Sequence, residues 1–462
     1  MSGEFHGKRA IVMGLGRFGG GIGVTRWLCE QGAKVLVTDM ASEDKLAESL
    51  QLLDGLEFTR RLGGHDLADL DHCDLLVVSP AVDKKKSAFF QSAIDRGIPW
   101  TSEMNLFLER CRGTLVGITG TVGKSTTTAM IGTILDSAAR SSDWGNGKVW
   151  LGGNIGKSLL DDLPNIAAND VVVLELSSFQ LEDAVGIRRS PHIAVITNLR
   201  DNHLDRHGTM AEYAEAKSNI FRHQKPSDHL LMPLDEDLSA FPGQWRTREN
   251  LRWYGVNREL RAMRFSRSAD SHGELHELAA KLTVPGLHNL MNAAAAVSVA
   301  RLLGVSDDIS CQALSEFGGL PHRLEFVGEF AGIKYYNDSK ATTPEAAMTS
   351  LAAFESPVIL VVGGSDKGSP FDELARAVAH RAKAAICIGQ TGPRLADEIE
   401  RCKSAGAGAV VERASDFPSA LVLARSHARG GDVILLSPGC ASYDWFKNYE
   451  DRGEQFRRLA GQ

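Results

Sequence analysis

The segment Gly117-Ile-Thr-Gly120-Thr-Val-Gly123-Lys124-Ser125-Thr126 has the residue types of a phosphate-binding loop. It follows a short apolar run and precedes a helical pattern, the context in which glycine-rich loops surround phosphates with backbone amides. Lys124 would neutralise the terminal phosphates, and the Ser125 or Thr126 hydroxyl would bind Mg²⁺. The strict GxxxxGK[ST] pattern is not met, because Ile118 stands at the place of the first glycine. The spacing still predicts a site for nucleotide phosphates.

Two further stretches place polar side chains directly after apolar strands. Glu175 lies near the end of the run 171–176, where a carboxylate is unfavourable unless it faces a cation or a ligand. We therefore expect Glu175 to bind Mg²⁺, with a buried structural salt bridge as the alternative. The second stretch, 197–208, contains His203 and His207. His207 is expected to be an ordinary hydrogen-bonded histidine.

A third motif, Gly14-Leu-Gly16-Arg-Phe-Gly19, matches GxGxxG between a strand and a helix. Asp39 ends the next strand about 20 residues later, where an acidic side chain can bind a ribose hydroxyl. The glycines would let the backbone approach a diphosphate at the helix N-terminus. The motif alone leaves open a nicotinamide cofactor, another nucleotide diphosphate, or a tight turn without a ligand.

Parallel strands must position these residues. Short runs that are apolar throughout, rather than alternating, are typical of central parallel strands covered on both faces. Helical patterns such as 125–137 and 291–303 lie between many of them, so we predict an α/β fold. The expected strands are 9–14, 34–38, 74–78, 171–176, 193–197, 358–362, 385–388 and 433–436.

A chain of 462 residues is expected to form about three domains at roughly 150 residues each. The charged helical segment 103–112 precedes a new strand, and a glycine-proline break lies at 318–323. These features predict domains 1–112, 113–319 and 320–462.

Composition excludes several classes of protein. Lys and Arg total 51 against 58 Asp and Glu, a formal net charge of −7, which argues against nucleic-acid binding by bulk electrostatics. No apolar run approaches the roughly 18 residues of a membrane span, and the first residues lack signal-peptide features. The seven cysteines include no CxxC pair. We therefore expect a reduced, cytoplasmic chain without membrane insertion.

Taken together, the motifs resemble those of the ATP-dependent Mur ligases from Gly14 to Phe456. The family implies an N-terminal Rossmann-like domain for a UDP-muramoyl substrate, a central P-loop ATPase-like domain with a parallel sheet, and a C-terminal Rossmann-like domain for an amino acid. The matching stretches are the phosphate loop, Glu175–Gln180, Asn198–Asp205, Lys217, Gly286–Asn292, Leu320–Arg323, Asn337–Thr342, Gly363–Lys367 and Leu436–Ser442.

The resemblance implies ATP, two Mg²⁺ ions and a carbamylated lysine, and it assigns their residues. Those for ATP are Gly120, Thr121, Gly123, Lys124, Ser125, Thr126, Asn289, Asn292, Arg323 and Asp338. Those for the metal are Ser125, Glu175, His203 and Lys217. Carbamylation would convert the Lys217 cation into a carboxylate-like ligand. The implied catalytic residues are Lys124, His203, Lys217 and Lys340.

The resemblance also assigns two substrate sites. It implies that the glycine motif at residues 14–19 binds uridine diphosphate rather than NAD. The UDP-muramoyl site comprises Gly14, Gly16, Arg17, Phe18, Asp39, Ser79 and Asn154. The amino-acid site comprises Thr342, Lys367, Ser442, Tyr443 and Tyr449. An aliphatic residue is common in the family at the place of Tyr443, and phenylalanine at that of Tyr449. These departures leave D- versus L-glutamate open.

The expected reaction is an amide ligation that adds D-glutamate to UDP-N-acetylmuramoyl-L-alanine through an acyl phosphate, and we expect a monomer. Alternatives are the same chemistry with L-glutamate or another amino acid, or a folylpolyglutamate synthetase-like enzyme, which generally lacks the N-terminal domain. An NAD-dependent oxidoreductase would leave the phosphate loop unexplained. A non-catalytic nucleotide sensor would release no phosphate in response to both substrates.

Overall fold

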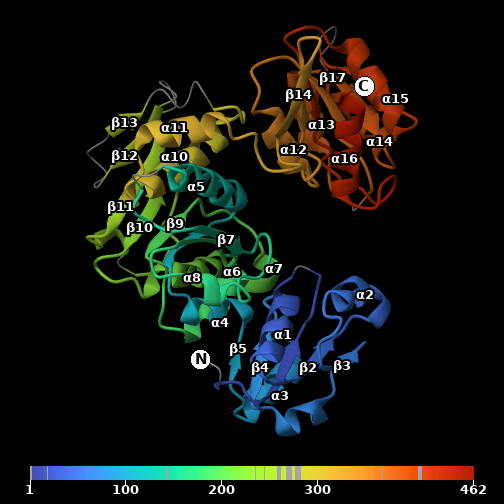
Figure 1. Ribbon diagram of the computed structural model, residues 1–462. Helices are drawn as coiled ribbons and strands as arrows, with labels where there is room; N and C mark the ends of the chain where they lie inside the picture. Colours follow the sequence, from blue (N-terminus) through green and yellow to red (C-terminus); the bar gives the residue numbers. More distant parts are fainter. Residues whose placement is uncertain are drawn as a thin grey trace. The chain divides into compact units, whose positions relative to one another are not determined.

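The computed structural model describes residues 3–17, 19–141, 144–234, 236–243, 245–257, 262–266, 273–275, 282–366, 368–403 and 408–461. The strands within these ranges form three sheets (Figure 1). The chain divides into two compact units, Met1–Leu275 with Asn292–Ser310, and His276–Met291 with Cys311–Gln462. The first unit contains two sheets and the second contains one. The domain boundaries at 112/113 and 319/320 stay predictions.

The N-terminal sheet is parallel throughout, with strand order β3-β2-β1-β4-β5. Ala10 and Val12 pack in one apolar cluster with helix α1, while Ile11 and Met13 pack in another with α3, so both faces are covered. The order changes direction between β1 and β4, where parallel sheets open a ligand crevice. The elements are β1 Arg9–Met13, α1 Gly20–Glu30, β2 Lys34–Asp39, α2 Glu43–Gln51, β3 Thr59–Leu62, β4 Leu75–Val78, α3 Ala88–Asp95, β5 Trp100–Thr101 and α4 Glu103–Arg110.

The central sheet has the order β13-β12-β11-β10-β9-β6-β8-β7. The prediction of a parallel sheet is confirmed from β7 to β11, but β12 and β13 pair antiparallel at one edge. Antiparallel neighbours need only short connections, so they extend the sheet without further crossover helices. The strands are β6 Thr114–Thr119, β7 Val149–Gly153, β8 Val171–Glu175, β9 Ile193–Ile196, β10 His229–Pro233, β11 Leu251–Asn257, β12 Ala262–Ser266 and β13 Gly273–Leu275.

Helices of this region connect the strands and carry several predicted site residues. They are α5 Lys124–Ala139, α6 Ser178–Asp183, α7 Leu204–His207, α8 Met210–Arg222, α10 Leu287–Leu302 and α11 Asp307–Ser315. One apolar cluster runs from Val12 and Trp27 through Phe107 of α4 to Leu115 and Val172. The N-terminal and central sheets therefore share a core, which explains why they lie in one unit. Among the described residues, no helix combines the length and apolarity that crossing a membrane requires.

The C-terminal sheet has the order β14-β15-β19-β16-β17-β18, parallel except for the pair β14–β15. Alternate residues of β16 join two apolar clusters, one with α12 to α14 and the other with α15 and α16. The predicted α/β class is confirmed. The elements are β14 Glu325–Phe330, β15 Ile333–Asn337, α12 Pro344–Leu351, β16 Val358–Gly363, α13 Asp372–Arg381, β17 Ala382–Ile388, α14 Gly392–Cys402, β18 Val410–Arg413, α15 Phe417–His427, β19 Val433–Leu436 and α16 Tyr449–Ala460.

Arg452 of α16 joins the loops that follow β15 and β19. Its side chain is fully buried, and its guanidinium donates to the Ser339 hydroxyl (2.9 Å) and to the carbonyls of Ser339 (2.8 Å), Cys440 (3.1 Å) and Ala441 (3.2 Å). Burial lowers the pKa of Arg452 to about 10, so the group is still charged at neutral pH. The two loops carry Lys340, Thr342 and Ser442.

We predict that Arg452→Leu destabilises the C-terminal unit by about 3–5 kcal/mol, because it leaves several buried acceptors without a donor. Calorimetric thermal unfolding resolves separate transitions in a chain of more than one unit. Arg401→Leu on the exposed surface of α14 is the control and should change stability by no more than about 0.5 kcal/mol. Equal unfolding profiles for the two variants would contradict the prediction.

Candidate functional site

The phosphate loop, residues 120–123, connects the end of β6 to the start of α5. Gly120 has φ of +150°, and a Cβ there would lie 2.0 Å from the Thr197 hydroxyl oxygen, so only glycine fits. The Asn198 amide oxygen accepts from the backbone N–H groups of Thr121 (3.2 Å) and Val122 (3.0 Å). Thr197 donates to the Val122 carbonyl (2.7 Å). Thr197 and Asn198 were not predicted as site residues, although their place after β9 was a usable signal.

Two lysines from different helices reach the same loop carbonyl. The Nζ of Lys124 donates to the carbonyls of Gly120 (3.1 Å) and Thr121 (2.8 Å). The Nζ of Lys217, on α8, donates to the Gly120 carbonyl (2.8 Å), and its side chain is 1% exposed. Burial, and then the neighbouring Lys124, lower the pKa of Lys217 well below its ordinary value. The structure therefore favours a neutral amine at Lys217.

Glu175 lies at the same edge of the sheet as the phosphate loop, because β8 pairs in parallel with β6 and places Glu175 opposite Ile118. Its carboxylate is buried, and Oε1 accepts from the Asn154 side-chain amide (2.9 Å). Within the described ranges, Oε2 has no hydrogen-bond partner. A buried carboxylate oxygen without a donor is unfavourable, and such an oxygen is a preferred Mg²⁺ ligand. Glu175, with the buried Ser125 on the phosphate loop's helix, therefore fits the predicted cation.

His203 and His207 differ in their surroundings. His203 immediately precedes α7 with a left-handed φ of +54°. Partial burial lowers the pKa of His203, which favours the neutral imidazole that binds metals. His207 is buried, lies 3.0 Å from the Ser178 hydroxyl and stacks on the Phe179 ring. His207 is therefore a hydrogen-bonded core histidine, as expected.

Helix α10 carries the two asparagines predicted to lie near adenine. Asn292 is close to the phosphate loop: its Oδ1 accepts from the Thr127 hydroxyl (3.2 Å) and lies 2.5 Å from where a Cβ on Gly123 would be. Asn289 lies in the other unit, where its side chain donates to the Pro285 carbonyl (2.7 Å). The structure thus brings Asn292 close to the phosphate loop.

The ligand crevice that the strand order predicts for the N-terminal sheet, called the N-terminal crevice below, is bordered by Gly14 and Ser79, which follow the adjacent strands β1 and β4. A Cβ on Gly14 would lie 2.8 Å from the Ser79 Cβ, so the two loops approach closely. Asp39 accepts from the backbone N–H groups of Gly16 (3.2 Å) and Ala41 (2.8 Å). The exposed Arg17 donates to the Lys45 carbonyl. Asp39 therefore orders the glycine loop, and Phe18 lies outside the described residues.

Asp338 in the second unit is buried with both carboxylate oxygens hydrogen-bonded. Oδ1 accepts from the Leu324 N–H (3.1 Å), and Oδ2 accepts from the hydroxyls of Ser350 (2.5 Å) and Ser437 (2.8 Å). Burial raises the pKa of Asp338 to about 6. The exposed Arg323 directly precedes Leu324, so Asp338 orders the turn that presents Arg323.

Thr342, Ser442 and Tyr443 of the predicted amino-acid site lie on the loops that Arg452 joins, and Tyr449 begins helix α16. The Lys340 Nζ is 5.1 Å from the centre of the Tyr449 ring, a distance at which a cation is attracted to an aromatic face. Burial first, and then Glu450, raise the pKa of Tyr449 to about 12. Ser442 is buried and Thr342 half-buried, whereas Tyr443 is 71% exposed. Lys367 lies outside the described residues.

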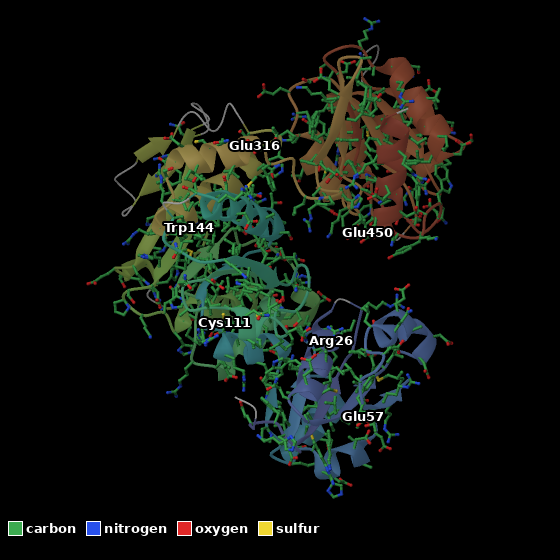
Figure 2. All side chains as sticks on the ribbon, viewed as in Figure 1. Arg26, Glu57, Cys111, Trp144, Glu316 and Glu450 are labelled. Atoms are coloured by element: carbon green, nitrogen blue, oxygen red, sulfur yellow. The ribbon has the colours of Figure 1, made fainter. Side chains whose placement is uncertain are left out.

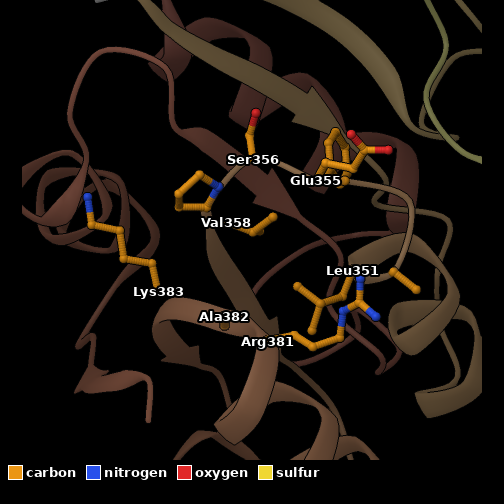
Figure 3. Close-up of a pocket in the computed structure, with 10 residues that line it drawn as sticks. Leu351, Glu355, Ser356, Val358, Arg381, Ala382 and Lys383 are labelled. Carbon is orange, nitrogen blue, oxygen red and sulfur yellow. The ribbon is translucent and has the colours of Figure 1, made fainter. Parts of the chain in front are cut away.

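A cavity of about 580 Å³ in the second unit does not coincide with these loops. Its lining includes Val358 and Ala382, the first residues of the parallel strands β16 and β17 (Figure 3). The cavity therefore opens at the amino edge of the sheet. Lys340 and Ser442 follow the carboxyl ends of β15 and β19 at the opposite edge.

Three family models match the chain in succession. They are "Mur ligase MurD-like, N-terminal domain" at residues 8–102, "Mur ligase middle domain" at 118–300 and "Mur ligase, glutamate ligase domain" at 322–440. Two relatives are named UDP-N-acetylmuramoylalanine–D-glutamate ligase. The one from Roseiflexus sp. (strain RS-1) is 39% identical, covering 99% of both chains. The one from Symbiobacterium thermophilum is 38% identical, covering 98% of this chain and 97% of the relative.

Solved Mur ligases share the fold. The UDP-N-acetylmuramate-alanine ligase MurC from Thermotoga maritima superposes with a TM-score of 0.56 at 21% identity, covering 99% of this chain and all (100%) of its own. MurF ligase from Thermotoga maritima, solved in complex with ADP, gives a TM-score of 0.56 at 19% identity, with coverage of 98% and 97%. The chain has the three-domain Mur ligase fold. From the continuous matches along its length, it belongs to the Mur ligase family, in the group of the UDP-N-acetylmuramoylalanine–D-glutamate ligases.

Proposed function

We propose that this chain is an ATP-dependent ligase that joins D-glutamate to UDP-N-acetylmuramoyl-L-alanine in the synthesis of peptidoglycan precursors. Relatives with that activity in their name match nearly the whole chain at up to 39% identity. The observation that carries the proposal is the meeting of the phosphate loop with Lys124, Lys217 and Glu175 at one edge of the central sheet. That arrangement suits transfer of a phosphoryl group to a carboxylate.

The reaction needs two steps at this site. The terminal phosphoryl group of ATP passes to the alanyl carboxylate, giving an acyl phosphate and ADP. The glutamate amine then attacks the acyl carbon, and the tetrahedral intermediate collapses to the amide, releasing phosphate and a proton. Phosphoryl transfer depends mainly on positioning and charge neutralisation. The amides of the phosphate loop and Lys124 perform both tasks, and Lys340 and Arg323 add positive charge.

Mg²⁺ would be held by Ser125, Glu175, His203 and a carbamate on Lys217. When bound, the metal neutralises charge on the transferred phosphoryl group. The lowered pKa of Lys217 supports the carbamate, because only a neutral amine reacts with CO₂. Its nitrogen lone pair forms a bond to the carbon of CO₂ and a proton leaves to solvent. The product is an anion, which suits a metal site better than an ammonium.

Further residues of the chain would bind the two other substrates and the nucleotide. Gly14, Gly16, Arg17, Asp39, Ser79 and Asn154 would bind the UDP-muramoyl substrate, together with Phe18. Thr342, Ser442, Tyr443, Tyr449 and Lys367 would bind glutamate, and Asn289, Asn292, Arg323 and Asp338 would serve ATP. We also propose that the chain acts as a monomer. The free cysteines of the structure support the cytoplasm as its compartment.

Phosphate release tests the proposed substrates. The purified chain is given UDP-N-acetylmuramoyl-L-alanine, ATP and Mg²⁺ with D-glutamate, L-glutamate, D-aspartate or L-lysine in separate reactions. We expect release with D-glutamate alone. Turnover confined to L-glutamate would reverse the stereochemical assignment and keep the ligase. No turnover with any of the four would reject the substrate class, and folate substrates would then be tried.

Lys217→Ala should lower kcat by on the order of a hundredfold or more, because it removes the carbamate from the charge-stabilising site. The matched control Lys225→Ala removes an exposed lysine just beyond the same helix and should remain active. Depleting CO₂ from the buffer should also reduce wild-type activity, and added bicarbonate should restore it. An intact-mass spectrum of an unmodified chain in a fully active sample would refute the carbamate.

A further inference from the structure

Arg206 of α7 connects the central sheet region to the N-terminal crevice. Its guanidinium donates to three successive carbonyls, those of Pro80 (2.7 Å), Ala81 (3.1 Å) and Val82 (2.7 Å). These residues directly follow Ser79, which packs against Gly14 where the strand order changes direction. One side chain of the central region thus holds the loop, residues 79–82, that borders the crevice.

The other side of the same guanidinium faces the surroundings of His203. The Arg206 Cζ lies 4.1 Å from the centre of the Phe179 ring. The Phe179 ring in turn lies 5.0 Å from the ring of His203 and stacks on His207. His203 also precedes Arg206 by three residues, at the start of α7. The crevice loop and His203 are therefore connected through Arg206 by two short routes, one along α7 and one through Phe179.

Other contacts already hold the two regions of this unit together. Lys84 forms an ion pair with the buried Asp183 (2.7 Å), and Arg26 of α1, labelled in Figure 2, forms one with Asp161 (3.0 Å). The shared apolar core of α4 adds to them. None of these contacts involves residues 79–82 or α7. Loss of the Arg206 side chain should therefore leave the two regions docked while releasing the crevice loop.

We propose that Arg206 is a positioning residue that couples binding of the UDP-sugar substrate in the N-terminal crevice to the placement of His203 beside the phosphate loop. The inference rests on the proposed function. A planar guanidinium binds several carbonyls in a fixed geometry, which a lysine ammonium does not reproduce. A shift of residues 80–82 on substrate binding is thus transmitted to α7. In the same way, a change in the position of His203 shifts this loop.

Arg206→Met removes all three hydrogen bonds and keeps much of the apolar stem. We expect the KM for UDP-N-acetylmuramoyl-L-alanine to rise at least about tenfold, and the Mg²⁺ concentration that gives half the maximal rate to rise as much. The free energy of a tenfold change is a modest part of what three hydrogen bonds from a charged donor contribute. The KM for D-glutamate should stay within about twofold of the wild-type value, because the substitution displaces no other group. Arg206→Lys should fall between wild type and Arg206→Met, and it supplies the measurement if Arg206→Met does not fold.

Lys85→Met is the matched control, because Lys85 also joins the two regions through a single cation, in an exposed 3.9 Å ion pair with Glu212. It should behave as wild type. Calorimetric titration of UDP-N-acetylmuramoyl-L-alanine without ATP should show the same loss of affinity in Arg206→Met, independent of turnover.

Three results would overturn the coupling. The first is a rise in the KM for the UDP-sugar with an unchanged Mg²⁺ requirement, which would limit Arg206 to the crevice loop. The second is an equal rise in every KM with a lowered melting temperature, which would make its role structural. The third is behaviour like Lys85→Met. If the wild type itself releases no phosphate, the proposed function fails, which is a separate outcome.

Discussion

The buried amine of Lys217 beneath the phosphate loop is the constraint on which the central region depends. An ammonium removed from water is strongly unfavourable, so burial lowers the pKa of Lys217 and favours the neutral form, although the nearby Glu175 acts in the opposite direction. The amine still needs an acceptor, which the Gly120 carbonyl provides only because glycine permits the loop's backbone conformation. Tyr213, one turn earlier on α8, lies below the amine and reaches the Thr121 hydroxyl. Helix α8 and the loop are therefore fixed to each other.

Arginines in both units hold loops that carry or border predicted site residues, by donating to backbone carbonyls. Arg452 joins the loops after β15 and β19, and Arg206 holds the loop after β4. Loops at the carboxyl edge of parallel strands carry carbonyls that the sheet does not satisfy. A rigid fork of N–H donors satisfies several of them at once and fixes the loop at the same time. Preorganised loops of this kind suit a reaction that depends on positioning.

Contacts within the second unit support two of the predicted site residues. The ring of Tyr449 faces the Lys340 ammonium. The attraction between the cation and the ring does not need the tyrosine hydroxyl. Asp338 is bound by three donors of its own unit. These contacts make Asp338 shape the turn at Arg323, whether or not Asp338 also contacts a nucleotide.

Local patterns predicted many of the central strands, but not β10, which is buried and lies between β9 and β11. Strands such as β8, β16 and β19 are apolar throughout and buried on both faces, so composition alone identifies them. The short β3 and β18, with sequences TRRL and VVER, are largely exposed and carry no such signal. The antiparallel pairing of β12 and β13 was also not predicted, because pairing direction depends on distant partners.

The sequence by itself determined the phosphate loop, the carboxylate of Glu175 and the α/β class, because each depends on residues adjacent in the chain. The role of Lys217 came only from resemblance, since the Gly120 carbonyl it contacts is 97 residues away. The contacts of Asn198, Arg452 and Arg206 were decided by the tertiary structure alone. Each of these residues binds a backbone group far away in the sequence. The separation is 76 residues for Asn198 and Val122, 126 for Arg206 and Pro80, and 113 for Arg452 and Ser339. Backbone carbonyls and amides are the same at every position, so no side-chain pattern reveals which of them an arginine or asparagine will meet until the chain has folded.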